Sequence, residues 1–297
     1  MKTKVAKITD SGTGSDIKTR ITISTDSTAD LTPELYERYK IQVLPLGVVI
    51  KDKLYTDGVD VKPKDVYEAV EKQNIMPKSS AAPDADFAEL FAKNADSECH
   101  IHFSISTKLS ACYNNAIRAA SDFPNVHIID SKVLSSGTGL LAIIAREMDE
   151  AGAQPKEIVE KMKEYADKQH TSFVIDSLKY LYKGGRVSGL KLLGANILSI
   201  HPQLVMDSDG NLIQGKKFKG NFPKVVKEYT KSIIDGAKDA NKDLVMITRT
   251  TIDPAIEKQM EEDLKAAGFK RIFHTVAGSV ITCHCGRNTI GILYVDK

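Results

Sequence analysis

The sequence lacks several features that mark particular protein classes. It has only four cysteines in 297 residues, too few to indicate a disulfide framework in a chain of this length. No run of 18 apolar residues predicts a transmembrane helix, and the first 20 residues contain no apolar stretch typical of a signal peptide. The net charge is +2, so no overall basic field favours nucleic-acid binding. These absences predict a cytoplasmic protein that is not integral to a membrane and does not bind nucleic acid.

The common nucleotide-binding and catalytic motifs are absent as well. The sequence contains no GxxxxGK[ST] phosphate-binding loop, no GxGxxG dinucleotide fingerprint, no GxSxG nucleophile elbow and no HExxH zinc motif. Hydrophobic residues make up 42% and charged residues 27% of the chain, a composition typical of globular proteins. The length suits two domains of average size.

Strand-like and helix-like segments alternate through the first half of the chain. Short β-branched segments predict strands, and amphipathic segments of ten or more residues predict the helices between them. Thr32 followed by Pro33 is a typical helix start, and Pro45 interrupts an apolar segment. The strands are expected at 21–25, 41–50, 100–106 and 126–130, and the helices near 63–72, 83–93, 137–152 and 155–169. Such alternation predicts right-handed crossovers and a mainly parallel sheet.

The second half has a different pattern. Asp207-Ser208-Asp209-Gly210 is a hairpin turn signal between two strand-like segments. The segment 254–267 begins with Asp253 and Pro254 and ends at Gly268, as a capped helix does. We therefore predict an α/β fold in three parts: a polar extension at 1–20, an N-terminal, mainly parallel α/β domain at 21–170, and a C-terminal mixed α/β domain at 171–297.

His284 lies between Cys283 and Cys285, which raises the possibility of a metal or redox site. We expect an extended segment here, and adjacent residues of a strand point to opposite faces, so the three side chains would not share one metal ion. Structural zinc sites and redox pairs usually have CxxC spacing, which is absent. Two interpretations remain: buried thiols around a core histidine, or a histidine held at a strand end for a ligand.

Serines precede two predicted helices. Ser110 follows a strand, and a helix is expected to begin near Ala111; Ser79 and Ser80 lie in a predicted loop ahead of another helix. Hydroxyls and free amides at a helix start can bind an anion, but they equally serve as helix caps. Two basic segments, 183–186 and 216–219, are either solvated or a docking patch for an anionic partner.

Several of these segments together resemble the DegV family of fatty-acid-binding proteins. The resemblance runs from about residue 21 to the C-terminus, with its markers in matching order. They are Asp26-Ser27-Thr28-Ala29-Asp30-Leu31, Pro45-Leu46, Tyr55-Thr56-Asp57-Gly58, the run SISTKLSACYNNA, the run SLKYLYKGGRVSG and His284-Cys285-Gly286.

The resemblance implies a lipid carrier rather than an enzyme. Family members hold one fatty acid between an N-terminal α/β domain and a C-terminal domain, with the carboxylate bound by hydroxyls and a histidine. The resemblance implies that the corresponding residues here are Ser79 and Ser80, Ser110, the amide of Ala111, and His284. No cofactor is implied.

The same resemblance implies a partner. A separate ATP-binding subunit of fatty acid kinase would phosphorylate the bound long-chain fatty acid. Arg186 and Lys219 would face that subunit.

The sequence departs from the family pattern at Ala81, Ala82, Arg287 and Asn288. We place Arg287 near the expected carboxylate, where it would strengthen anion binding or favour another head group. Asn288 tolerates the left-handed backbone that the turn needs. Two alternatives stay open: a serine hydrolase or acyltransferase built from Ser110 and His284, and a sensor of another small anion.

Overall fold

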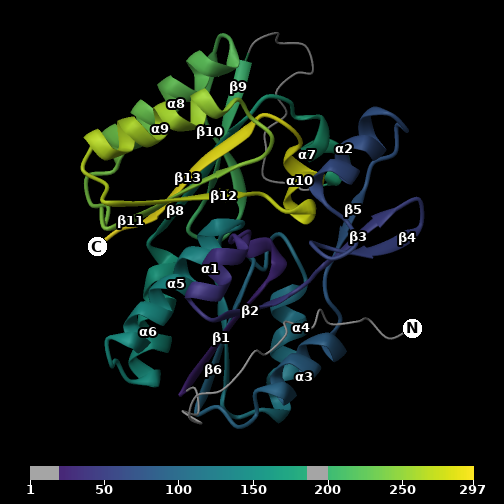
Figure 1. Ribbon diagram of the computed structural model, residues 1–297, viewed down its shortest axis with the longest axis vertical. Helices are drawn as coiled ribbons and strands as arrows, with labels where there is room; N and C mark the ends of the chain where they lie inside the picture. Colours follow the sequence, from purple (N-terminus) through teal and green to yellow (C-terminus); the bar gives the residue numbers. More distant parts are fainter. Residues whose placement is uncertain (1–19, 186–199) are drawn as a thin grey trace.

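The computed structural model describes residues 20–185 and 200–297. This part of the chain forms two α/β halves that follow one another along the long axis of the molecule (Figure 1). The predicted fold class, a parallel-sheet N-terminal domain with a mixed C-terminal domain, is confirmed. The domain boundary stays a prediction; the first strand of the second sheet begins at Gln169. Residues 1–19 of the predicted extension and Arg186 lie outside the described residues.

The N-terminal half is built on a parallel four-stranded sheet in the order β2-β1-β6-β7. Its strands are β1 (Ile21–Asp26), β2 (Ile41–Leu44), β6 (Cys99–Ser104) and β7 (Val126–Asp130). Helices cover both faces: α1 (Pro33–Arg38), α3 (Asp84–Lys93), α4 (Cys112–Ala119), α5 (Ser136–Glu150) and α6 (Pro155–Asp167), with short 3-10 turns η1 (Ser27–Ala29) and η2 (Ala120–Asp122). Helices α3 and α4 lie on one face and α5 and α6 on the other (Figure 1).

The C-terminal half is built on a six-stranded sheet in the order β10-β9-β8-β13-β11-β12, in which only the β11–β12 pair is parallel. The strands are β8 (Gln169–Ile175), β9 (Ile200–Met206), β10 (Leu212–Lys219), β11 (Leu244–Arg249), β12 (Arg271–Val276) and β13 (Thr289–Val295). Helices α8 (Phe222–Gly236) and α9 (Pro254–Ala266) cover one face. Helix α5 packs against the other face, with Leu140 and Leu141 in one apolar cluster with Met246 and Leu293, so it contacts both large sheets.

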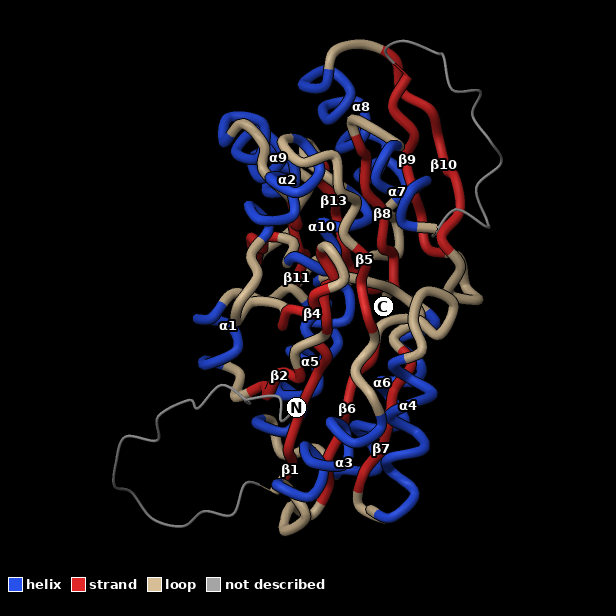
Figure 2. Tube along the Cα trace, turned by 90° about the vertical axis from the view of Figure 1, so that its right-hand side faces the viewer, coloured by secondary structure: helices blue, strands red, loops and turns tan. Residues whose placement is uncertain are grey.

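A third, small sheet lies where the two halves meet. It is antiparallel, has the order β4-β3-β5, and consists of β3 (Gly47–Ile50), β4 (Lys53–Thr56) and β5 (Lys78–Ser80). Three short helices lie close to it: α2 (Pro63–Glu71), α7 (Lys179–Gly184) and α10 (Ser279–Cys285). Figure 2 shows β4 and β5 at the level of the junction between the halves.

Local signals in the sequence predicted several elements correctly. The Thr32 hydroxyl accepts a hydrogen bond from the Leu35 amide at the start of α1. Pro45 separates β2 from β3, which belong to different sheets. The hairpin of β9 and β10 turns at Gly210, whose φ of 82° is the left-handed conformation that glycine adopts without strain.

Two predictions about local structure were wrong. Ser79 and Ser80 lie on a strand, β5, because Val48 and Gly47 of β3 pair with them across more than 30 positions of sequence. The segment around His284 is a helix, α10, rather than an extended strand. The first amides of α10 donate hydrogen bonds to side chains of the N-terminal half. No local sequence pattern could have predicted these contacts.

A pair of histidines is buried in the N-terminal sheet. The hydroxyl oxygen of Ser24 lies 2.7 Å from Nε2 of His100 and 2.8 Å from Nδ1 of His102. Both rings pack edge-on against phenylalanines of α3. Burial lowers the pKa of His100 to about 4 and that of His102 to about 3. Both imidazoles are therefore neutral near neutral pH.

These histidines predict a loss of stability in acid. In the unfolded chain a histidine takes up a proton below about pH 6.5, but the folded core resists it, so stability falls as pH drops below that value. Each histidine should cost roughly 2 kcal/mol of unfolding free energy by about pH 5. Urea unfolding at about pH 7 and pH 5 measures this loss of unfolding free energy. The double variant His100→Asn/His102→Asn should lose less than the wild type between the two pH values. The exposed His170→Asn is the control; an equal loss in all three proteins would contradict the prediction.

Candidate functional site

One cavity lies between the two halves and receives side chains from both. Its volume is ≈ 360 Å³, within the range of roughly 300–1,000 Å³ common for small-molecule pockets. Most of its lining is aliphatic or aromatic, with a minority of hydroxyl groups and one imidazole. The lining residues are Thr28, Leu46, Ser79, Ser80, Ala81, Ile105, Leu109, Ser110, Ala111, Leu134, Phe173, Leu181, Leu212, Val280, Ile281, His284 and Cys285.

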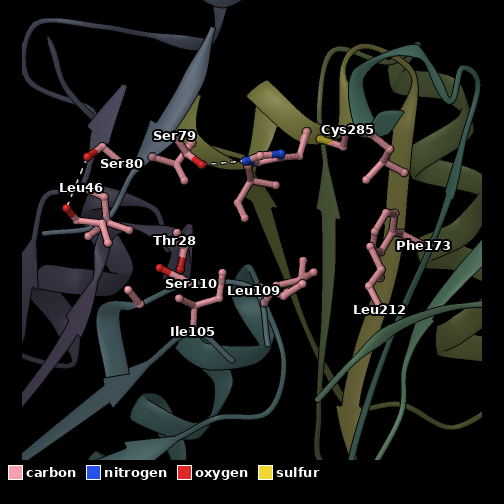
Figure 3. Close-up of a pocket in the computed structure, with 17 residues that line it drawn as sticks. Thr28, Leu46, Ser79, Ser80, Ile105, Leu109, Ser110, Phe173, Leu212 and Cys285 are labelled. Atoms are coloured by element: carbon pink, nitrogen blue, oxygen red, sulfur yellow. Dashed lines mark hydrogen bonds between the residues drawn. The ribbon is translucent and has the colours of Figure 1, made fainter. Parts of the chain in front are cut away.

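All five residues predicted to bind a carboxylate line this cavity: Ser79, Ser80, Ser110, Ala111 and His284. They come from three separate segments of the sequence. In Figure 3 the labelled serines lie on one side of the cavity, and Phe173 and Leu212 lie on the other. The structure therefore brings the predicted residues together. Their hydroxyls lie on a side of the cavity that also carries Leu46, Ile105 and Leu109, and the side of Phe173 and Leu212 is apolar (Figure 3).

Ser79 and His284 form the contact that joins the two halves across the cavity. The Ser79 Oγ lies 2.8 Å from Nε2 of His284 (Figure 3). Strand pairing of β5 with β3 fixes Ser79, and the last turn of α10 carries His284. In this contact one of the two groups donates to the other. When the imidazole Nε2–H donates, the hydroxyl proton of Ser79 remains available to an anion.

Two glycines allow close packing beside His284: Gly184 packs against the imidazole, and Gly286 packs against the ring of Tyr180. A Cβ on Gly184, the last residue of α7, would overlap Nδ1 of His284. A Cβ on Gly286 would lie 2.5 Å from the ring of Tyr180, and Gly286 has a φ of 69°. Only glycine combines this backbone conformation with such close packing. Helix α7 therefore supports the face of His284 that points away from Ser79.

Ser110 both lines the cavity and caps a helix. Its Oγ accepts a hydrogen bond of 3.2 Å from the Cys112 amide and lies 3.1 Å from Cys112 Sγ. Ala111 is the N-cap residue of α4, as the predicted helix start requires. The same hydroxyl therefore bonds to the first turn of the helix and lines the cavity, and its binding of an anion stays a prediction. The described contacts of Ser110 do not include His284, so the serine–histidine pair that a hydrolase would need is not formed here.

The cysteines beside His284 are structural. All four cysteines of the chain are buried and free, and no group of three metal-binding side chains occurs within residues 20–185 and 200–297. Burial raises the pKa of the Cys283 thiol to about 12 and raises that of Cys285, so both remain protonated. The geometry gives no support to a zinc or redox site.

Buried carboxylates surround the start of α10, and no pattern in the sequence marks them as part of the site. Asp30 accepts a hydrogen bond of 2.8 Å from the Gly278 amide, and Asp57 accepts one of 2.9 Å from the Ser279 amide. Burial raises the pKa of Asp57 and raises that of Asp30 well above its usual range. Both aspartates lie within the family-like markers, but a sequence does not reveal that their partners are amides more than 200 residues away.

Arg287 does not occupy the position expected for it. Its Nε lies 2.6 Å from Oε1 of Glu71, and its guanidinium group lies 3.9 Å from the ring centre of Tyr67. It is absent from the cavity lining. The prediction that it lies near a bound carboxylate is wrong, because α2 supplies both an acid and an aromatic face outside the cavity. Arg287 instead joins α2 to the end of α10.

The remaining predicted positions are at the surface or outside the described residues. Asn288 has a φ of 50°, so it does adopt the left-handed conformation, and its side-chain Nδ2 donates to the Asp176 carboxylate. Lys219 is exposed at the end of β10. Arg186 falls in the segment 186–199, which is not described. No helix in the described ranges is long and apolar enough to span a membrane.

Comparison with known proteins gives consistent matches along the chain. The DegV family model, described as an uncharacterised protein family, matches residues 20–297. A DegV domain-containing protein of Caldanaerobacter subterraneus subsp. tengcongensis is 30% identical over 288 residues, which cover 94% of this chain and 99% of that protein.

Solved structures match over the same range. A DegV family protein from Thermus thermophilus, described for its fatty acid binding, has a TM-score of 0.84 at 24% identity and covers 94% of this chain and 100% of its own. The hypothetical protein TM841 of Thermotoga maritima, described as revealing a fatty acid binding function, has a TM-score of 0.78 at 26% identity. That match covers 94% of this chain and 99% of the Thermotoga chain.

The contacts of Arg287 predict an effect on stability and none on ligand binding. Arg287→Ala should lower the unfolding free energy by about 1 kcal/mol, the sum of an exposed ion pair and an arginine–aromatic contact. Arg118→Ala is the matched control, since Arg118 makes an exposed two-bond pair with Asp84 within one half, and it should cost less. Denaturant unfolding and titration with a carboxylate ligand measure both effects. A drop in affinity beyond about tenfold would return Arg287 to the site.

Proposed function

Because the chain belongs to the DegV family, we propose that it binds one long-chain fatty acid in the cavity between its two halves. The acyl tail lies against the apolar side of the cavity. The carboxylate is bound by Ser79, Ser80, Ser110, the amide of Ala111, and His284. The fatty acid is the only ligand that the proposal requires, with no metal or cofactor.

One observation carries this proposal: the cavity combines an apolar lining with a cluster of hydrogen-bond donors on one side. A carboxylate that leaves water needs several donors, or its burial costs several kcal/mol. An acyl tail gains roughly 0.8 kcal/mol for each methylene that it buries, partly offset by the ordering of the chain. A fatty acid satisfies both sides of such a cavity. The fatty acid binding function described for the Thermotoga maritima protein, at 26% identity, supports the same ligand.

We further propose that the protein is a cytoplasmic carrier rather than an enzyme. Ser110 is bonded to Cys112 and not to His284, which gives no support to a hydrolase or acyltransferase. In the carrier role a separate ATP-binding kinase subunit phosphorylates the bound carboxylate to an acyl phosphate. Arg186 and the exposed Lys219 are the residues that we assign to that encounter.

Replacement of His284 tests the binding mode. His284→Ala should weaken binding of a long-chain fatty acid by about 10–100-fold, because a hydrogen bond to a charged group contributes roughly 1.5–3 kcal/mol. Binding of the methyl ester of the same fatty acid should change far less, because the ester carries no charge. Isothermal titration of both ligands measures the difference.

The exposed His127→Ala on β7 is the control for that experiment and should bind like the wild type. Equal losses for acid and ester would show that His284 supports the fold of the cavity and not the head group. An unchanged affinity for the acid would remove His284 from the site.

The carrier role predicts a separation between binding and transfer. Arg186→Ala and Lys219→Ala should keep the affinity for fatty acid and should lower acyl-phosphate formation when the kinase subunit and ATP are added. Lys216→Ala is the control, because Lys216 points to the other face of β10, where its Nζ donates to Ser232. Weaker fatty acid binding in either test variant would place that residue in the cavity wall and contradict the assignment.

A further inference from the structure

Helix α10 begins without a capping side chain of its own. Gly278 is its N-cap residue, and glycine has no side chain to receive the amides of the first turn. The first amides of any helix lack acceptors within the helix and need partners elsewhere. Here the partners belong to the other half of the molecule: Asp30 accepts from Gly278, and Asp57 accepts from Ser279. The Ser279 hydroxyl adds a third bond, 3.1 Å long, to the Val61 carbonyl oxygen.

The two carboxylates are themselves held in place. Both aspartates are about 5% exposed. The Ser135 hydroxyl donates to Asp30, and the Ser27 hydroxyl donates to Asp57 over 2.9 Å. Ser27 Oγ also accepts a bond from the amide of Leu46, a residue of the cavity wall. The acceptors for α10 are therefore part of a hydrogen-bonded network of the N-terminal half.

The space between these carboxylates and α10 is filled. A Cβ added to Gly278 would lie 3.0 Å from Oδ1 of Asp30 and 3.2 Å from Oδ2 of Asp57. Such contacts are tighter than nine in ten real Cβ contacts, so a side chain at this position requires the helix or the carboxylates to shift by a few tenths of an ångström. Glycine at 278 lets both carboxylates reach the helix start at once.

The other end of α10 carries His284. The helix has seven residues, about 10 Å at 1.5 Å per residue, so a displacement of its start is transmitted to the imidazole. Ser79, the partner of that imidazole, lies in the half that also contributes Asp30 and Asp57. Both ends of α10 thus make contacts with the N-terminal half.

We propose that Asp30 and Asp57 are positioning residues that fix α10 across the junction and thereby set where His284 meets the head group of the ligand. This inference rests on the proposed function, because it assigns the device that orients one of its binding residues. Neither aspartate touches the ligand; both act through the helix.

Substitutions at Asp57 separate positioning from general stability. Asp57→Ala removes the acceptor, whereas Asp57→Asn keeps a carbonyl oxygen that can still accept from Ser279. Asp57→Ala should bind a long-chain fatty acid at least about tenfold more weakly, and Asp57→Asn should recover most of that loss. In the ligand-free protein, the imidazole nitrogen resonances of His284 should shift in Asp57→Ala and return toward the wild type in Asp57→Asn; His284→Ala identifies the signal.

A second variant keeps the test decisive if Asp57→Ala does not fold. Gly278→Ala should shift the His284 signal and weaken binding in the same direction, because its methyl group crowds both carboxylates. Gly236→Ala is the matched control, since an added Cβ there meets nothing within 4 Å, and it should match the wild type.

The outcomes distinguish this inference from the proposed function. Folded Asp57→Ala or Gly278→Ala protein with the wild-type His284 signal and affinity would overturn the positioning role. So would equal destabilisation in Asp57→Ala and Asp57→Asn without a shift of the signal. If the wild type binds no fatty acid, the proposed function fails, while the ligand-free spectra still decide whether the aspartates position His284.

Discussion

The structure of the site depends on one set of contacts: carboxylates of the N-terminal half accept the first amides of α10 in the C-terminal half. The cavity has walls from both halves and exists only while they are joined. The junction is reinforced away from the cavity, where α5 packs between the two large sheets and its Glu147 pairs with Arg271 of β12.

The chemistry of the cavity follows from how the junction is built. Strand β5 and helix α10 supply Ser79 and His284, and the start of α4 supplies Ser110 and the Ala111 amide. Apolar residues of the two large sheets and their helices supply the rest of the wall. A ligand with one anionic end and a long apolar body matches this arrangement in both respects. For such a ligand, the imidazole and hydroxyls would set the direction of binding, and the apolar wall would supply most of the affinity.

Much of the fold could be predicted from the sequence, because local signals specify it. The cap at Thr32, the break at Pro45 and the turn at Gly210 all act within a few residues of their position. Helix α10 and strand β5 could not be predicted, because their partners lie in distant segments. The same limit applies to the site. Family-like motifs led to residues that do line the cavity, and their binding of a head group stays a prediction. Nothing in one sequence separates Leu212 in the cavity wall from a core leucine, or shows that Arg287 pairs with Glu71.

The central claim is that this cavity holds one fatty acid. Native mass spectrometry of the purified protein, followed by denaturation and identification of the released molecule, tests that claim directly. We expect one long-chain fatty acid for each chain, either already bound or taken up on addition. A protein that is empty and refuses added fatty acids, or that releases a short polar anion instead, would contradict it.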